Sequence, residues 1–549
     1  LGNKQLTVGG NNLSRSYGGS ITGSGGAIVK EGAGNWTLSG SNTYTGGTTI
    51  NAGTITISAN NNLGDASGAL TFGGGRLQTT ATFAMSRATT LNAGGGTFLV
   101  ASATTLTHSG VISGTGRLTK FGDGQLILDG VNTYEGGTTI NGGSVTVSAN
   151  TALGHVDGNL VFDGGSLRTT ANIAMSRATA LNAGGGTFQV GTNLTHNGVI
   201  SGSGRLTLAA IGTLVLTGAN DYQGGTRIHS GTISIAANNN LGDASGGLTF
   251  SGGGRLRTTA TFAMLRATTL DAGGGGFDVA SGTTLTQNGA IDGVGGLTKT
   301  GAGTLGLTGA NTYQGGTTIN AGILTVLANN NLGSAAGTLT FNGGTLQAIA
   351  SFAMSRATTL NAGGGTFDVA AGSTLVQDGA IGGAGGLTKT GGGTLAFTGA
   401  NTYGGGTTIN DGVLSISSDA NLGAAAGTLA FGGGVLRTTA DITMSRATTL
   451  NLRGLFDVAT GTTLTQNGVI GGADGITKSG GGTLVLGAAN TYGGQTTIEG
   501  GTLALSGAGS IGASSVVSLT ISGATFDISA ASGDRTIGDL SGVTGTTVK

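Results

Sequence analysis

The sequence repeats itself with a period of about 90 residues, and this periodicity limits the fold more than any other feature. One tyrosine marks the same place in six copies, at intervals of 90, 88, 91, 90 and 89 residues: Tyr44, Tyr134, Tyr222, Tyr313, Tyr403 and Tyr492. All five methionines keep the same period: Met85, Met175, Met264, Met354 and Met444. Such a period predicts a stacked architecture in which each repeat is stabilised by its neighbours.

Within a repeat, apolar and polar residues alternate as they do in β-strands. Leu126 and Leu128 form one apolar pair, Val145 and Val147 form the next, and Gly-Gly, Asn-Gly and Asp-Gly steps separate the strands. The first pairs lie 19 residues apart, which together with later pairs predicts about four coils of about 22 residues per repeat. The chain has no proline, as expected where almost every backbone N–H is needed for strand pairing.

The sequence therefore predicts an all-β fold, a single elongated right-handed parallel β-helix. Roughly 25 coils stacked at about 4.8 Å would extend for about 120 Å. Residues 1–40 are predicted to be a partial N-terminal repeat, residues 41–500 the β-helix of 90-residue repeats, and residues 501–549 divergent coils of the same β-helix.

Composition excludes several classes of function. Charged residues make up 8% of the chain and the net charge is zero, whereas nucleic-acid binding requires clustered basic residues. No apolar run reaches the length of a transmembrane helix, so membrane insertion is not expected. The chain has no cysteine, and it begins at Leu1 without a charged and apolar leader, so we expect either a mature protein or a fragment.

The most regular part of each repeat is a run of the form Leu-Thr-Lys-x-Gly-x-Gly-x-Leu-x-Leu-x-Gly-x-Asn-Thr-Tyr-x-Gly-Gly-Thr-Thr-Ile-Asn-x-Gly. It resembles the passenger-associated repeat of bacterial autotransporters. The run is clearest at 297–322 and 387–412 and recognisable at 28–53, 118–143, 206–231 and 476–501. The resemblance implies a Gram-negative passenger domain, exported through the outer membrane and displayed on the cell surface or released. It says little about activity.

The four histidines do not predict a catalytic or metal site, because other repeats replace each of them. His108 and His196 stand where later repeats have glutamine, His229 where they have asparagine, and His155 where they have aspartate. Such exchange is typical of surface polar residues, so we expect no catalytic, metal or cofactor-binding residue here. The lysine that precedes each tyrosine by 14 residues is also optional, since Leu208 takes its place in the third repeat.

The carboxylates give one acid-rich group, Asp123, Asp129, Asp157 and Asp163. It could form a calcium or glycosidase-like site, although solvated turn residues are the simpler interpretation. The aspartates that recur after phenylalanine, such as Asp278 and Asp368, should lie four coils apart, too far for a hydrolytic pair.

Two further repeated motifs could suggest binding sites. The Met-Ser-Arg copies, of which Met85–Arg87 is the first, are interpreted as a core methionine beside an arginine at a corner. Ala-Gly-Gly-Gly turns lack the lysine and the helix of a phosphate-binding loop.

These features predict a structural adhesin rather than an enzyme. We expect it to associate with copies of itself, laterally or end to end, forming filaments or mediating aggregation and biofilm. Uncapped strand edges at both ends, zero net charge and faces of Thr, Ser, Asn and Gly favour self-association.

Three alternatives stay open: a β-helix carbohydrate-active enzyme, a passenger that binds host-surface or matrix glycans, and an ice- or surface-binding array. The last is suggested by threonine pairs such as Thr48-Thr49 and Thr317-Thr318. Since the pairs return every fourth coil, a continuous threonine lattice is not expected.

Overall fold

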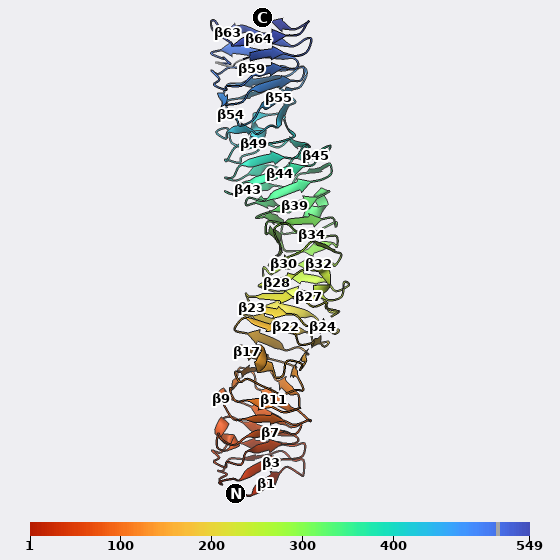
Figure 1. Cartoon of the computed structure of the whole chain (residues 1–549), viewed down its shortest axis with the longest axis vertical. Coiled ribbons are helices and arrows are strands. Elements are labelled where there is room, and N and C mark those ends of the chain that lie inside the picture. Colours follow the sequence, from red (N-terminus) through yellow and green to blue (C-terminus); the bar gives the residue numbers. More distant parts are fainter. Residues whose placement is uncertain (512–515) are drawn as a thin grey trace. The chain divides into compact units, whose positions relative to one another are not determined.

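The computed structural model describes residues 1–511 and 516–549, which form parallel β-strands, turns and short 3₁₀-helices. The chain divides into two compact units, Leu1–Gly275 and Gly276–Lys549. Each unit is a parallel β-solenoid, and the chain makes about 26 turns. Figure 1 shows the strands of successive turns stacked in each unit. The predicted parallel β-helix is confirmed, while its right-handed sense stays a prediction.

One repeat of unit 1 illustrates the order of the elements. It contains eleven strands and one 3₁₀-helix: β14 (Leu118–Phe121), β15 (Gln125–Leu128), β16 (Thr138–Ile140), β17 (Ser144–Val147), η2 (Asn150–Leu153), β18 (Leu160–Phe162), β19 (Ser166–Thr169), β20 (Ile173–Met175), β21 (Thr179–Leu181), β22 (Gly186–Val190), β23 (Asn193–His196) and β24 (Ile200–Ser201). Because the sequence repeats, the other repeats form the same elements at equivalent positions.

The repeat is longer than a whole number of turns. In one sheet, Leu118 pairs with Thr138, Thr138 with Leu160 and Leu160 with Thr179, so one turn takes 19 to 22 residues. Four turns from Leu118 end in β24, but the equivalent of Leu118 is Leu206, which starts β25 (Leu206–Ala209) in the adjacent sheet. The prediction of about four coils per repeat is therefore close, and the structure shows about four and a third turns per repeat.

This extra third of a turn moves the 3₁₀-helix to a new face in each repeat. Before η2, the Asn132 side chain accepts a hydrogen bond from the backbone of Ile112, in β13 (Ile112–Ser113). Before η3 (Asn238–Leu241), the equivalent Asn220 accepts from Ile200 of β24, which belongs to a different sheet. Equivalent residues of successive repeats therefore face different directions within a unit.

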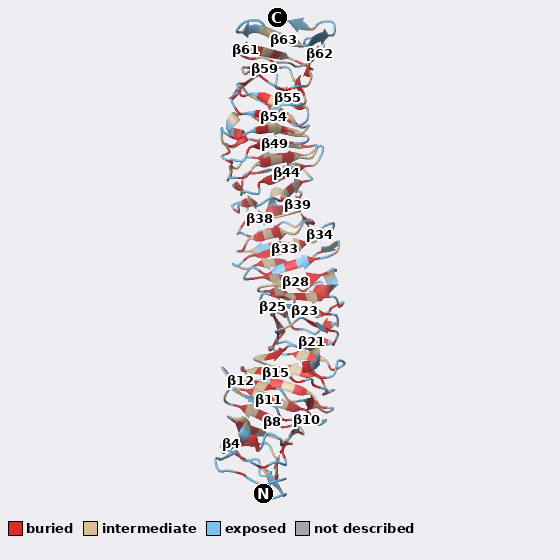
Figure 2. Ribbon diagram, turned by 60° about the vertical axis from the view of Figure 1, so that its left-hand side comes forward, coloured by how far each residue is buried: buried red, intermediate tan, exposed pale blue. Residues whose placement is uncertain are grey.

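Inward-facing residues of each sheet stack on one another along the solenoid. Phe98, Lys120, Ile140 and Phe162 occupy one such column, and all four have no exposed surface. Figure 2 shows buried residues alternating with half-buried ones along the strands, while turns are exposed. Each fully buried Leu, Ile or Phe contributes about 1.5–3 kcal/mol, so the core derives its stability from contacts between turns.

The segment after residue 501 continues the same pairing. Strands β61 (Thr502–Gly507) and β63 (Thr525–Ala531) pair in parallel, with one irregularity in their register. The division at Gly275 does not coincide with the predicted boundaries at residues 40 and 500, which stay predictions.

Candidate functional surface

The landmark tyrosines are structural. Tyr134 is completely buried, and its hydroxyl lies 2.6 Å from Oγ1 of Thr138. Beside it, the Asn132 side-chain amide donates to the carbonyl of Ala152 in η2. Burial raises the pKa of these tyrosines, to about 12 for Tyr403. The asparagine and the tyrosine of the Asn-Thr-Tyr motif therefore fix the turn and are not available to a ligand.

The arginine of each Met-Ser-Arg motif lies at the corner between two strands, as predicted, and its side chain is buried. Arg177 is 2% exposed, and its guanidinium donates to the carbonyls of Asn150, Leu153, Gly154, His155 and Gly158 and to the Asn150 side chain. These atoms surround η2 and the loop after it, where backbone carbonyls have no partner within the helix. The methionine lies in the core as predicted, since Met175 is 1% exposed.

The repeated lysine, like the arginine, is buried and surrounded by backbone carbonyls, and we call these two arrangements the lysine cage and the arginine cage. The Nζ atom of Lys120 donates to the carbonyls of Phe121, Gly122 and Gly142 at 2.9, 2.6 and 3.3 Å. Burial lowers the pKa of Lys120 to about 8, and the nearby Asp123 opposes this shift. All three ammonium protons are used within the protein, so the lysine binds the turn together.

Two of the histidines are buried, and their predicted place at the surface is wrong. His108 and His196 are 1% and 0% exposed, and each Nε2 lies 2.8 Å from a threonine Oγ1, of Thr89 and Thr179 respectively. Each ring also packs edge-on against a phenylalanine. Burial lowers the pKa of both histidines to about 4. His155 and His229 are exposed, as predicted for surface residues.

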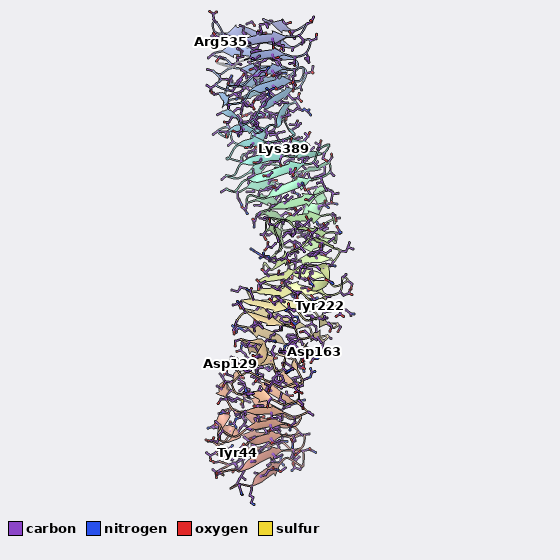
Figure 3. The ribbon with its side chains drawn as sticks, in the orientation of Figure 1. Tyr44, Asp129, Asp163, Tyr222, Lys389 and Arg535 are labelled. Atoms are coloured by element: carbon purple, nitrogen blue, oxygen red, sulfur yellow. The ribbon has the colours of Figure 1, made fainter. Side chains whose placement is uncertain are left out.

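The acid-rich group does not converge. Asp129 follows β15 and Asp163 follows β18, strands of two different sheets, and Figure 3 shows the two side chains on opposite sides of unit 1. Asp123 precedes β15, and Asp157 lies in the turn before β18. Within residues 1–511 and 516–549, no three acidic or histidine side chains gather as metal ligands.

Outward-facing threonines form a short column that is interrupted at both ends, where Ile323 and Ala430 occupy the adjoining turns. In unit 2, Thr345, Thr366, Thr388 and Thr408 lie on four successive turns. Only the second threonine of each pair belongs to such a column, because the first is buried against the tyrosine. Threonines from neighbouring strands, which are not part of the pairs, fill the intervening turns. The threonines of the column are half-buried, and Asp368 lies on the same face two residues after Thr366.

Sequence reasoning missed the arginine and lysine cages because a charged residue normally predicts an exposed position. A signal was present in the spacing. Arg87, Arg177 and Arg356 each follow the first asparagine of a 3₁₀-helix by 27 residues, and Arg266 follows it by 28, a nearly constant distance expected for partners in the structure.

A family model described as the passenger-associated-transport-repeat matches residues 28–57, 118–147, 211–235, 297–326, 387–416 and 476–505. Each matched stretch contains the Asn-Thr-Tyr or equivalent turn and the strands that flank it. These repeats, together with the relative described next, support an autotransporter passenger domain. Passenger domains of this type are exported through the outer membrane, which places this one at the cell surface.

The passenger domain is similar to the Adhesin BmaC autotransporter of Brucella suis biovar 1 (strain 1330), with 52% identity over 149 residues. The matched part is 27% of this chain and 4% of the relative. No solved structure matches. In the described part of the passenger domain, no helix is long and apolar enough to cross a membrane.

Proposed function

We propose that this passenger domain is a non-enzymatic adhesin that associates side by side with copies of itself, so that cells aggregate or form a biofilm. The observation that carries the proposal is the column of Thr345, Thr366, Thr388 and Thr408 on four successive turns. A second copy has the same spacing of about 4.8 Å between turns, so hydroxyls of two such columns can meet in register.

Charge and energetics support the same proposal. The chain has zero net charge, so copies do not repel one another at long range. Each intermolecular hydrogen bond contributes about 1 kcal/mol net, and many repeated contacts are needed for stable association. The similarity to a protein named as an adhesin also favours an adhesive role.

Sedimentation velocity and electron microscopy over a range of protein concentrations test the proposal. The parent chain should form larger species as concentration rises. The Thr366→Lys/Thr388→Lys variant should stay monomeric, because it places like charges on the column. A matched control, Ala335→Lys/Ala336→Lys, adds the same charge at exposed turn positions and should still associate. A parent chain that is monomeric at every concentration would refute self-association.

The non-enzymatic part of the proposal has its own test. Hydrolysis of polysaccharides or peptides by the parent chain, lost in Asp129→Ala or Asp163→Ala, would favour the alternative of a carbohydrate-active enzyme. We expect no turnover, because these carboxylates lie in different sheets.

A further inference from the structure

A groove in unit 1 runs across the turns that precede β22 and β25. It is a polar cavity of about 390 Å³, lined by Gly164, Ala183, Gly184, Gly185, Gly186, Thr187, Ser203, Gly204, Arg205, Thr207 and Gly224. Ligand pockets begin at about 300 Å³. The glycines leave backbone groups accessible, and three hydroxyls and one guanidinium supply hydrogen-bonding side chains.

Arg205 is the side chain that sets this groove apart from its equivalent in the preceding repeat. There, Arg117 donates to Oγ1 of Thr139 at 2.9 Å and to Oδ1 of Asn159 at 3.0 Å. The residues equivalent to these two partners are Arg227 and Gly247, neither of which has a side chain that can accept a hydrogen bond from Arg205. Arg205 keeps only a contact of 3.3 Å from its Nε to the carbonyl of Gly224. Its two terminal nitrogens are therefore available to a ligand.

The charged residues beside the groove differ in whether they are paired. Arg227 lies on the next turn, paired with Thr207 in the sheet, and its positive charge is balanced by Asp271. Asp271 and Ser251 engage Arg227 at 3.3 and 3.1 Å. The carboxylate of Asp163 flanks the groove, but it already accepts from the backbone of Gly184. Arg205 thus has no acidic partner of its own among the described residues.

We propose that this groove binds an acidic sugar residue of a glycan chain. The guanidinium of Arg205 would bind the carboxylate or sulfate, since guanidinium groups match such planar or multidentate anions. Sugar hydroxyls would form hydrogen bonds with the side chains of Thr187, Ser203 and Thr207 and with the backbone of the glycines. This inference does not rest on self-association of the chain.

Unit 2 provides an internal reference for the proposal. The equivalent groove, with a cavity of about 220 Å³, is lined by Gly343, Gly364, Gly386, Gly405 and Thr388 among others, and none of its lining residues is charged. Gly386 stands in the place of Arg205. We therefore expect the acidic glycan to bind unit 1 and not this groove of unit 2.

Calorimetric titration of the full chain with three size-matched oligosaccharides tests the assignment. Hyaluronan fragments carry carboxylates, heparin fragments carry sulfates as well, and dextran fragments are neutral. We expect saturable binding of one or both acidic sugars that weakens as salt is added, and the two acidic probes show which anion is preferred. Arg205→Gly should weaken binding at least 10-fold, whereas the matched Arg117→Gly should change it less than 2-fold.

A second variant separates the role of the free guanidinium from that of net charge. Gly247→Asn restores the amide partner that Arg117 has in Asn159 without changing the net charge, and a Cβ at Gly247 meets only the Ala267 carbonyl at 3.6 Å. The new side chain should accept a hydrogen bond from the Arg205 guanidinium and so reduce glycan binding as strongly as Arg205→Gly does. The proposal is overturned if no acidic sugar binds, if dextran or inorganic polyphosphate binds equally well, or if Arg117→Gly has the same effect as Arg205→Gly.

Discussion

The two units have the same repeated framework but place different polar residues in the core. In unit 1, His196 contacts the Gly198 carbonyl through Nδ1 at 3.1 Å. In unit 2, Gln377 stands in the equivalent position and its Nε2 donates to the equivalent carbonyl, of Gly379, at 2.8 Å. The hydrogen bond is conserved between the units, but only the histidine can take up a proton. The comparison teaches that one framework accommodates two different responses to acid.

The largest effect should come from the arginine cage, which the units share. Replacing Arg177 in unit 1 or Arg356 in unit 2 by methionine removes the guanidinium hydrogen bonds to five backbone carbonyls, of which two in each case keep another donor. We expect each change to lower the free energy of unfolding by about 3–5 kcal/mol, measured by denaturant titration.

The exposed Arg168 is the matched control, and Arg168→Met should have little effect. Very different losses for Arg177→Met and Arg356→Met would contradict a framework common to both units.

The next effect should separate the units. His108 and His196 have a pKa of about 4 in the folded state, below the ordinary value of 6.5. A depressed pKa means that the stabilisation is complete above pH 6.5 and is lost as the pH falls through 4. Each histidine should therefore cost about 3 kcal/mol of stability between pH 7 and pH 4.

Hydrogen exchange at both pH values should show loss of protection confined to unit 1. His108→Gln/His196→Gln, which copies the residue of unit 2, should remove most of that loss, and His155→Gln at an exposed site should not. Acid sensitivity unchanged in the double variant would show that other groups are responsible.

A smaller effect is expected from the lysine cage. The pKa of Lys120 and of Lys389 is about 8 in the folded state, below the ordinary 10.5. The free energy of unfolding should therefore increase as the pH rises from 8 towards 10.5, and this gain is lost as the pH falls through 8. Lys120→Leu copies Leu208 of the third repeat. The stability of the parent minus that of the variant should therefore increase between pH 7.5 and pH 9.5, by less than the histidine effect. A difference that stays constant or decreases would contradict the assignment.

The smallest effect concerns a hydroxyl without a partner. Thr169 in unit 1 and Thr438 in unit 2 point into the core, and their Oγ1 atoms have no hydrogen-bond partner. The fourth repeat has Ala348 at this position, also buried. Replacing either threonine by valine should change the free energy of unfolding by less than about 1 kcal/mol, in the stabilising direction if at all. Thermal unfolding would detect a larger loss, which would show that the hydroxyl has a role.

Much of the fold could be predicted because strand alternation and the period are local properties of the sequence. The number of turns per repeat was close, but the extra third depends on the length of each turn, 19 to 22 residues, which alternation does not define.

The buried charges and the histidines could not be placed in the same way. Exchange of His196 for Gln377 suggested a tolerant surface, whereas both side chains satisfy the same buried carbonyl. Likewise, Arg205 and Arg117 look equivalent in sequence, and only their neighbours in space show that one is free.

The extra third of a turn has a genetic consequence. Recombination between nearly identical repeats can remove one copy. At the junction, a strand of the later repeat, such as β25, would then take the position that its equivalent in the removed repeat, β14, had occupied. The chain would refold without a defect, yet every surface feature downstream of the deletion in unit 1 would turn by about 120° around the axis. Loss of three copies would restore the original direction. A change in repeat number would therefore alter which side of the molecule carries a given epitope, and not only how many copies there are.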